Sequence, residues 1–189
     1  MSTDMQIALV GVIGTLAGTV LGWLLNNISQ TGKLHLYVCS FEDSFQRHGS
    51  FGDMHSSSSV EDTQYYSYHL LLDLYNSSGA TKIARNLTVV FSDGKNDLYK
   101  SVPYDNHTRR ASGHACFYDE IGPVNIPPKS VIQVCLHKGA WYNDNGLDFI
   151  WKTKKVYLTY TDENNRFKKV KIKSEDYSRY FETHKTQDG

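Results

Sequence analysis

The residues from Ile7 to Leu25 form an apolar run, IALVGVIGTLAGTVLGWLL, that contains no charged side chain. About 20 consecutive apolar residues are enough to cross the hydrocarbon core of a bilayer as a single helix. The run therefore predicts a transmembrane helix over residues 7–25. A short extension (1–6) precedes it, and a polar connector (26–32) follows it.

The small residues of this helix share one face. At about 100° per residue, the small and weakly polar side chains fall in one arc and most of the bulky ones in the opposite arc. Lipid tails are as apolar as leucine, so helices in a bilayer associate through close backbone contact, which glycine permits. This glycine zipper predicts a homo-oligomer in the lipid bilayer, with the helices packed through Ala8, Gly11, Gly14, Gly18 and Gly22.

Three polar residues, Thr15, Thr19 and Asn26, lie on the same face of the predicted helix. We expect them to hydrogen-bond between helices, or to line a narrow polar path if several helices form a ring. The alternative is a plain anchor that at most dimerises, because glycine is common in membrane helices generally.

The charges on either side of the helix predict its orientation. No Lys or Arg precedes the run, and Lys33 is the first basic residue after it. A secretory signal would open with positive charge, so we expect an uncleaved anchor with the C-terminal domain in the cytoplasm. Three widely spaced cysteines, typical of a reducing compartment, favour the same side of an inner or plasma membrane. Four Asn-X-Ser/Thr sequons argue against a cytoplasmic domain, since such sites are glycosylated in secretory chains.

Residues 33–173 predict one β-rich domain. From Lys33 onward the formal charge of the chain is about +1, because Asp4 is the one charged residue that precedes Lys33, and this offers no broad electrostatic footprint for nucleic acid. Alternating apolar residues between turn signals predict a mainly β, antiparallel sandwich or barrel. The predicted strands are 33–41, 64–75, 83–91, 98–102, 115–118, 130–136, 156–160 and 167–172. In the polar tail, 174–189, aromatic residues at helical spacing predict a short helix that docks on the sheet.

Two segments resemble a known pattern. YHLLLDLYNSSGATKIARNLTVVF, from Tyr68 to Phe91, and VYLTYTDENNRFKKVKI, from Val156 to Ile172, resemble the strands and turns of immunoglobulin-like β-sandwiches. The chain lacks the paired cysteines and central tryptophan of antibody domains. A glycine-zipper helix followed by such a domain is similar to the architecture of bacterial anti-phage membrane effectors. That resemblance implies a soluble domain that senses a nucleotide or nucleic-acid signal, and membrane helices that form a pore. It carries no ligand-binding residues onto this chain.

No common catalytic signature is present. The chain has no GxSxG, HExxH, Walker or dinucleotide-binding motif, so we expect neither an enzyme nor a cofactor. The best metal-ligand set is His114 and Cys116 with Cys135, and it lacks the recognisable pairs of ligands that zinc sites use. We predict no metal site.

Binding is the remaining class of function. His107, Arg109 and Arg110 lie in a polar segment where the two guanidinium groups could meet a phosphate. The Ser- and Gly-rich stretch 41–62 predicts a long connection, which in a compact domain is either disordered or used. Trp141 and Tyr142 are predicted to lie in a loop, where aromatic residues either anchor a partner or belong to the half-buried surface of the sandwich.

The final hairpin carries Lys169, Lys171 and Lys173 on one face. Lysines at these positions are typical of an exposed edge strand protected against aggregation.

These observations support two hypotheses. The first is an oligomeric single-pass membrane effector in which a cytosolic β-sandwich sensor controls a pore or ion channel, in anti-phage defence. Its partners would be the lipid bilayer, further copies of the chain, and a nucleotide or oligonucleotide signal or a second protein encoded nearby. The alternative is a membrane-anchored binding or scaffold protein whose helix is a simple tether.

Overall fold

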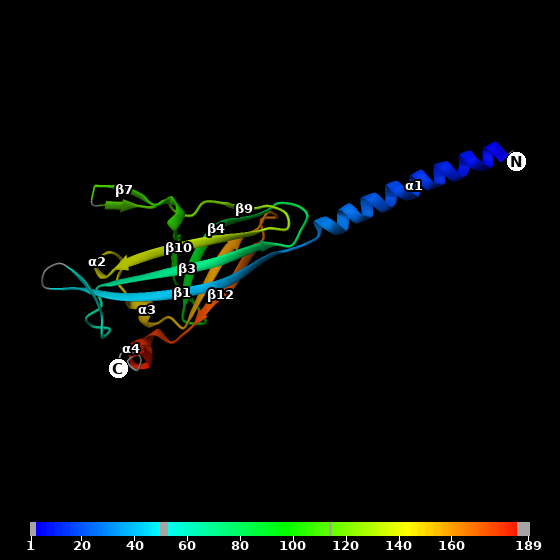
Figure 1. Cartoon of the computed structure of the whole chain (residues 1–189). Coiled ribbons are helices and arrows are strands. Elements are labelled where there is room, and N and C mark those ends of the chain that lie inside the picture. Colours follow the sequence, from blue (N-terminus) through cyan, green and yellow to red (C-terminus); the bar gives the residue numbers. More distant parts are fainter. Residues whose placement is uncertain (1–2, 50–52, 114, 185–189) are drawn as a thin grey trace.

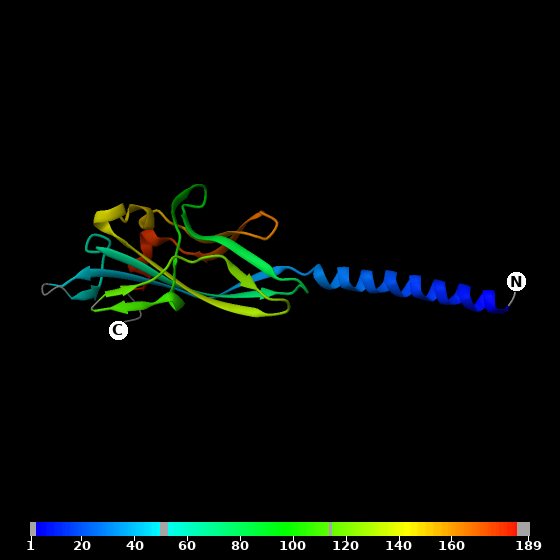
Figure 2. The ribbon, with the colours of Figure 1, turned by 90° about the horizontal axis from the view of Figure 1, so that it is seen from above.

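A long helix leaves one end of a β domain in the computed structural model (Figure 1). The structure describes residues 3–49, 53–113 and 115–184. The helix, α1 (Thr3–Gln30), has no buried residue, and both views show it extending away from the β domain (Figures 1 and 2). It is long and apolar enough to cross a membrane, and it extends beyond the predicted span at both ends.

The β domain follows α1 without a long linker. Its elements are β1 (Leu34–His48), β2 (Met54–Ser56), β3 (Tyr65–Asn76), β4 (Lys82–Ser92), β5 (Asp97–Ser101), β6 (Tyr104–Asp105), η1 (Asn106–Thr108), β7 (Arg110–Ser112), β8 (Ala115–Phe117), β9 (Val124–Ile126), β10 (Val131–Trp141), α2 (Tyr142–Asn145), α3 (Asp148–Trp151), β11 (Lys155–Thr161), β12 (Phe167–Ser174), η2 (Tyr177–Arg179) and α4 (Tyr180–His184).

The described strands form two five-stranded antiparallel sheets. One sheet has the order β2-β1-β3-β10-β6, and the other has β12-β11-β4-β5 with β9 also paired to β4. A separate ribbon, β7-β8, stands beside them (Figure 1). The prediction of a mainly β fold with one N-terminal helix and an antiparallel β-sandwich is confirmed.

The core lies between the two sheets. Every second residue of β3 points inward, and Leu70, Leu72 and Leu74 are fully buried. Val89 of β4 and Leu158 of β11 are equally buried in the opposite sheet. This alternation of buried and outward-facing residues is how two packed sheets share one apolar layer.

Two local predictions were wrong. The stretch 41–62 was expected to be a long connection, yet β1 continues to His48 and forms a hairpin with β2. The Ser and Gly content of this stretch favours a loop, but pairing with a distant strand decides its structure. β1 pairs with β3 as far as Gln46, and Phe45 is buried in the core. Trp141 and Tyr142 do not lie in an open loop; Trp141 ends β10 and Tyr142 begins α2.

The C-terminal tail packs on the end of the domain farthest from α1. Tyr177 of η2 is fully buried, and the Tyr180 ring lies tilted against Phe45 with the ring centroids 4.5 Å apart. Trp151 of α3 lies 5.3 Å from the same Phe45 ring. An aromatic cluster therefore closes the far end of the sandwich.

Candidate functional site

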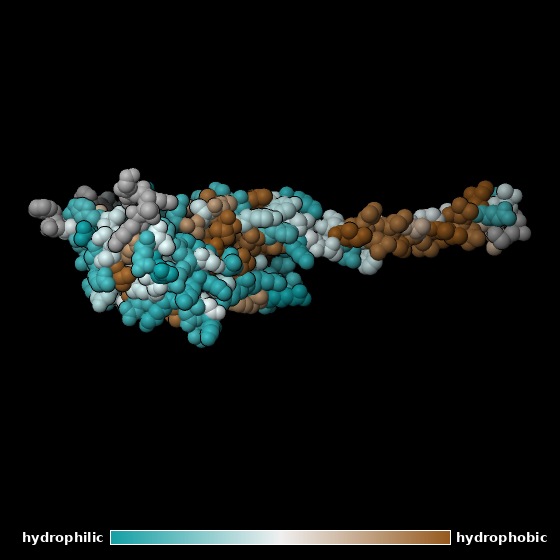
Figure 3. All heavy atoms as spheres, turned by 90° about the horizontal axis from the view of Figure 1, so that it is seen from below, coloured by the Kyte–Doolittle hydropathy of each residue, from teal (hydrophilic) through white to brown (hydrophobic). Residues whose placement is uncertain are grey.

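The small face of α1 is open. A Cβ atom added at Gly11, Gly14, Gly18 or Gly22 would meet nothing within 4 Å. Figure 3 shows α1 as apolar along most of its length, in contrast to the mainly hydrophilic β domain. In the described chain this face has no intramolecular contact, so a second helix has access to it.

The predicted pore-lining residues bond within their own helix. The Thr15 hydroxyl donates to the Gly11 carbonyl and the Thr19 hydroxyl to the Thr15 carbonyl, both at 2.9 Å. Asn26 Oδ1 accepts a hydrogen bond from Gln30 Nε2 at 3.3 Å. Threonine can sit in a membrane helix at low cost in this way, and its oxygen remains an acceptor for a neighbour.

The end of α1 is joined to the turn between β3 and β4 by backbone hydrogen bonds. The Gly79 N–H donates to the Ser29 carbonyl at 2.7 Å, and the Ser77 N–H donates to the Lys33 carbonyl at 3.0 Å. The Lys33 N–H in turn donates to Ser77 Oγ at 2.9 Å. We call Ser29, Gly32, Lys33, Ser77 and Gly79 the junction. It ties the helix to the domain at several points rather than through a free linker.

Two glycines make this close approach feasible. A Cβ on Gly32 would lie 2.3 Å from backbone atoms of Ser77 and Ser78, which no real Cβ contact tolerates. A Cβ on Gly79 would lie 2.6 Å from Ser29 Oγ and 3.0 Å from the Ser29 carbonyl oxygen. Backbone atoms cannot rotate aside as a side chain can, so Gly32 is the stricter requirement.

Asn76 supports the junction from inside the domain. Its buried side-chain amide donates to the carbonyls of Ala80, Ile126 and Pro127 at 2.8 to 3.0 Å, and its Oδ1 accepts from the N–H and hydroxyl of Ser78. A fully satisfied buried amide fixes the turn it bonds to. The sequence predicted a turn here but gave no sign that it holds the helix.

The predicted phosphate-binding residues lie around the β7-β8 ribbon. Arg110 forms an ion pair with Asp119. Arg109 donates to Cys116 Sγ at 3.3 Å, and the His107 ring lies 3.1 Å from an Asp105 oxygen. All three predicted side chains are exposed. A phosphate here would have to compete with Asp119 for Arg110.

The candidate metal ligands fall partly outside what is described. His114 lies outside the described residues. The two thiols have different neighbours, since Cys116 Sγ accepts from Arg109 and Cys135 Sγ from Asn106 Nδ2.

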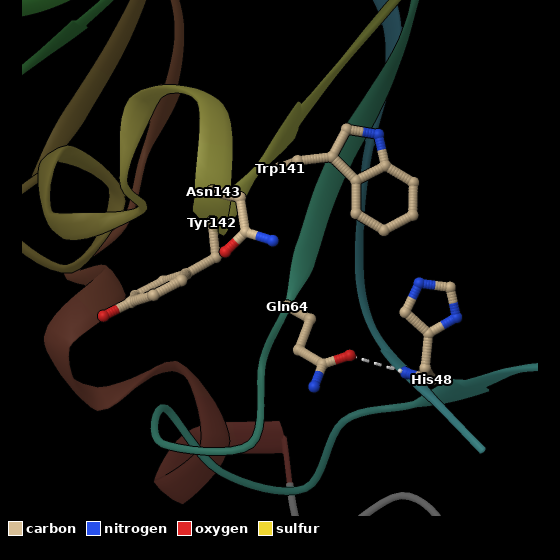
Figure 4. A pocket seen from close by; sticks show the side chains of 5 residues that line it. All are labelled: His48, Gln64, Trp141, Tyr142 and Asn143. Atoms are coloured by element: carbon tan, nitrogen blue, oxygen red, sulfur yellow. Dashed lines mark hydrogen bonds between the residues drawn. The ribbon is translucent and has the colours of Figure 1, made fainter. Parts of the chain in front are cut away.

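A hollow of about 260 Å³ opens at the far end of the domain, and its lining residues are His48, Gln64, Trp141, Tyr142 and Asn143 (Figure 4). The His48 and Trp141 rings stack with centroids 5.4 Å apart, while Tyr142 points away from them. Gln64 Oε1 accepts the His48 N–H at 3.0 Å. Exposed aromatic faces beside amide groups are typical of surfaces that bind other molecules.

A buried carboxylate closes the sandwich along the side where β1 and β12 are neighbours. The Asp43 side chain is completely buried, and Lys173 Nζ lies 2.6 Å from it. The hydroxyls of Tyr66 and Tyr177 donate to the same carboxylate at 2.6 and 2.8 Å. Burial opposes the charge of Lys173, but Asp43 and Glu175 beside it raise the lysine pKa above its usual value. Lys169, Lys171 and Lys173 were predicted to protect β12 as an exposed edge strand. Lys173 has a further role, because it pairs with the buried Asp43.

Comparison with known families places the β domain. Residues 32–173 match the family model described as the YopI Ig-like domain, which covers well over half of the chain. The chain belongs to the YopI Ig-like domain family. This confirms the predicted immunoglobulin-like class.

A relative of this YopI-type chain is known from Bacillus subtilis strain 168. It is the SPβ prophage-derived uncharacterized protein YopI, 24% identical over 162 residues that cover 85% of this chain and 90% of the relative. Two solved structures are also similar. A Bordetella pertussis protein that bears the name ApaA is 13% identical, with a TM-score of 0.37, and the match covers 76% of this chain and 91% of that one. An uncharacterized β-sandwich protein from Clostridium difficile is 15% identical, with a TM-score of 0.34, over 75% and 86% of the two chains.

The YopI Ig-like match begins and ends at residues with structural roles. Gly32, its first residue, packs against the turn after β3, and Lys173, its last, pairs with Asp43. The matched region thus contains the domain side of the junction and the pair that joins the two sheets. Sequence reasoning missed Asp43 and Gly32. The signals that could have found them are an acid flanked by the aromatic residues Phe41 and Phe45 of one strand and a glycine just after a membrane helix.

Proposed function

We propose that this chain is a single-pass membrane protein that assembles through the small face of α1 and whose Ig-like domain controls the packing of the assembled helices. In the assembly, Thr15, Thr19 and Asn26 line a polar path, and a change in the domain opens or closes it. The β domain lies in the cytoplasm, and the membrane is the bacterial inner membrane. The setting is conflict between phages and their hosts, which the prophage origin of the Bacillus relative supports.

One observation carries the proposal: the junction joins α1 to the domain without a free linker. A protein that needs its helix only as a tether gains nothing from a fixed joint. A domain that must turn or spread helices needs one, because a flexible linker absorbs the motion before the helix feels it.

The test is to loosen the junction while keeping both parts. A flexible Gly-Ser segment inserted between Gln30 and Lys33 should abolish the conductance of the full-length protein in planar bilayers, and any toxicity on expression. The same segment inserted at Gly94, in the turn after β4, is the control for insertion itself. Unchanged conductance in the junction variant would refute control through a fixed joint.

Assembly is tested separately. Replacing Gly14, Gly18 and Gly22 together with Leu should lower the mass of the detergent-solubilised protein, measured by light scattering, because bulky side chains keep the helices apart. Exchanging bulky residues of the opposite face for others of similar size should leave the mass unchanged. A wild-type monomer would remove the oligomer from the proposal.

The second candidate is a membrane-anchored binding protein, favoured by the hollow beside Trp141 and His48. Here the far end binds a nucleotide signal or a second protein, and α1 is a tether. Exchange of α1 for an unrelated single-pass helix preserves function in this case and destroys it in the first.

A further inference from the structure

A second cavity lies where α1 meets the domain, and its lining is strongly charged. It has a volume of about 410 Å³, within the range of small-molecule sites. Its walls come from the connector after α1, the start of β4 and the β11-β12 turn. The charged residues that line it are Lys33, Lys82, Asp162, Glu163, Arg166 and Lys168.

The acids of this cavity are already engaged. Lys82 Nζ lies 2.5 Å from Glu163, so that pair is neutral as a unit. The Asp162 carboxylate accepts the N–H groups of Asn164 and Arg166 at 3.0 and 2.8 Å, which holds the turn in shape.

Two cations in the same cavity are not neutralised in this way. Among the described residues, neither Lys33 nor Arg166 forms an ion pair, and Lys168 reaches Asp162 only at 3.8 Å. The cavity therefore carries excess positive charge. Hydrogen-bond donors that have no acid as a partner suit an anion. The guanidinium of Arg166 and the ammonium of Lys33, which line the same cavity, suit a phosphate in particular.

The depth of the cavity points to the source of that phosphate. If residues 7–25 fill the hydrocarbon core, the five residues 26–30 rise about 7 Å above it at 1.5 Å per residue. The polar headgroup layer on each side of a bilayer is about 5–7 Å thick. Gln30 then stands at the outer edge of the headgroup layer, and the long side chain of Lys33, three residues further along, can extend back to the lipid phosphates. Two of the last four carbonyls of α1 are satisfied within the protein, because Thr31 bonds to the Ile28 carbonyl and Gly79 to the Ser29 carbonyl.

We propose that this cavity binds the headgroup phosphate of an anionic phospholipid, with Lys33 and Arg166 as its principal ligands. The bound lipid lies against both the connector and the β11-β12 turn and so reports membrane composition at the junction. The inference rests on α1 crossing a membrane, but not on the helices assembling or conducting.

The test uses the full-length protein in detergent, with phosphatidylglycerol and phosphatidylcholine offered in equal amounts and the retained lipid counted by native mass spectrometry. Wild type should retain phosphatidylglycerol preferentially. Lys33→Gln and Arg166→Gln should each lower that preference about fivefold, and the double variant about 25-fold, the effect expected of basic side chains at a lipid surface.

Lys171→Gln is the matched control. Lys171 is exposed on β12, outside the cavity and the junction, and forms no ion pair among the described residues. An equal loss in this variant would overturn a discrete site in favour of diffuse attraction. Equal retention of both lipids by wild type would overturn the proposal. So would full displacement of the lipid by excess inorganic phosphate, since the site would then serve a free anion. Thermal melting of each variant shows whether it is folded.

Discussion

The two ends of the β domain are closed by different kinds of contact. At the end near α1, backbone groups and glycines meet at hydrogen-bond distance, and Gly32 leaves no space for a side chain. At the far end, Phe45, Tyr177 and Trp151 close the sandwich with aromatic rings, and a hollow stays open beside Trp141.

This difference suggests a division of roles. Backbone contacts without side chains cannot rearrange by changing rotamer, so the near end suits a rigid connection between α1 and the domain. Aromatic and amide side chains around an open hollow can adapt to a partner, so the far end suits recognition. The variants below test whether the near end is rigid and the far end adaptable.

The largest effect on stability is expected at Asp43, toward the far end. Asp43→Ala leaves two buried tyrosine hydroxyls without their acceptor and leaves Lys173 with Glu175 as its remaining partner. An unsatisfied buried hydroxyl costs about 1–3 kcal/mol, so we expect a loss of about 3–5 kcal/mol of unfolding free energy. Chemical denaturation of the detergent-solubilised protein measures it. A loss below about 1 kcal/mol, the range of a surface pair, would mean that the far end does not depend on this carboxylate.

A smaller and more local effect is expected at Gly32. Gly32→Ala forces backbone atoms apart and should break the bonds from Gly79 to Ser29 and from Ser77 to Lys33. At about 1 kcal/mol for each hydrogen bond, the loss is about 2 kcal/mol. Hydrogen exchange at the Gly79 amide should become fast, while core amides of β3 stay protected. Gly122→Ala is the matched control, because a Cβ there meets nothing within 4 Å. Slow exchange at Gly79 in the Gly32 variant would show that the joint is not tight.

Trp141→Ala should cost less. Trp141 is partly exposed and makes two ring contacts, with Tyr65 at 4.5 Å and with His48 at 5.4 Å. An aromatic pair contributes about 0.5–1.5 kcal/mol, and the low end of that range for each of the two contacts of this partly exposed ring gives a loss of about 1 kcal/mol in thermal unfolding. If the far end binds a partner, this variant should lose binding while the junction amides keep their protection. Loss of junction protection would mean that the two ends are not independent.

The sequence predicted the fold better than the contacts between parts. Alternation and turn residues located most strands, and the apolar run located α1, because both signals are local in the chain. The extension of β1 to His48 was missed, since its pairing with β3 depends on residues far along the chain. The junction was missed for the same reason. Ser29 and Gly79 are separated in the sequence by the whole of β1, β2 and β3, and nothing in the composition around either residue marks the other. The roles of the predicted residues on α1 and around Arg110 stay predictions.

The smallest effect is expected from acid at the near end. Burial opposes ionisation of Asp162, but the N–H groups of Arg166 and Asn164, with Lys168 nearby, hold its pKa below the usual value of 3.8. A carboxyl whose pKa is lower in the folded state stabilises the protein above that value. Its contribution is lost as the pH falls below 3.8 toward the folded pKa. Asp162→Asn should therefore give a shallower acid limb in a plot of unfolding free energy against pH, with little change near neutrality.

Asp176→Asn is the matched variant. Asp176, beside η2, also has a lowered pKa, chiefly because the Ser178 hydroxyl donates a hydrogen bond to it. Hydrogen exchange at the Gly79 amide is the second readout. If acid speeds this exchange in wild type and in Asp176→Asn but not in Asp162→Asn, the β11-β12 turn is part of the rigid end. Equally faster exchange in all three proteins would place the turn outside it.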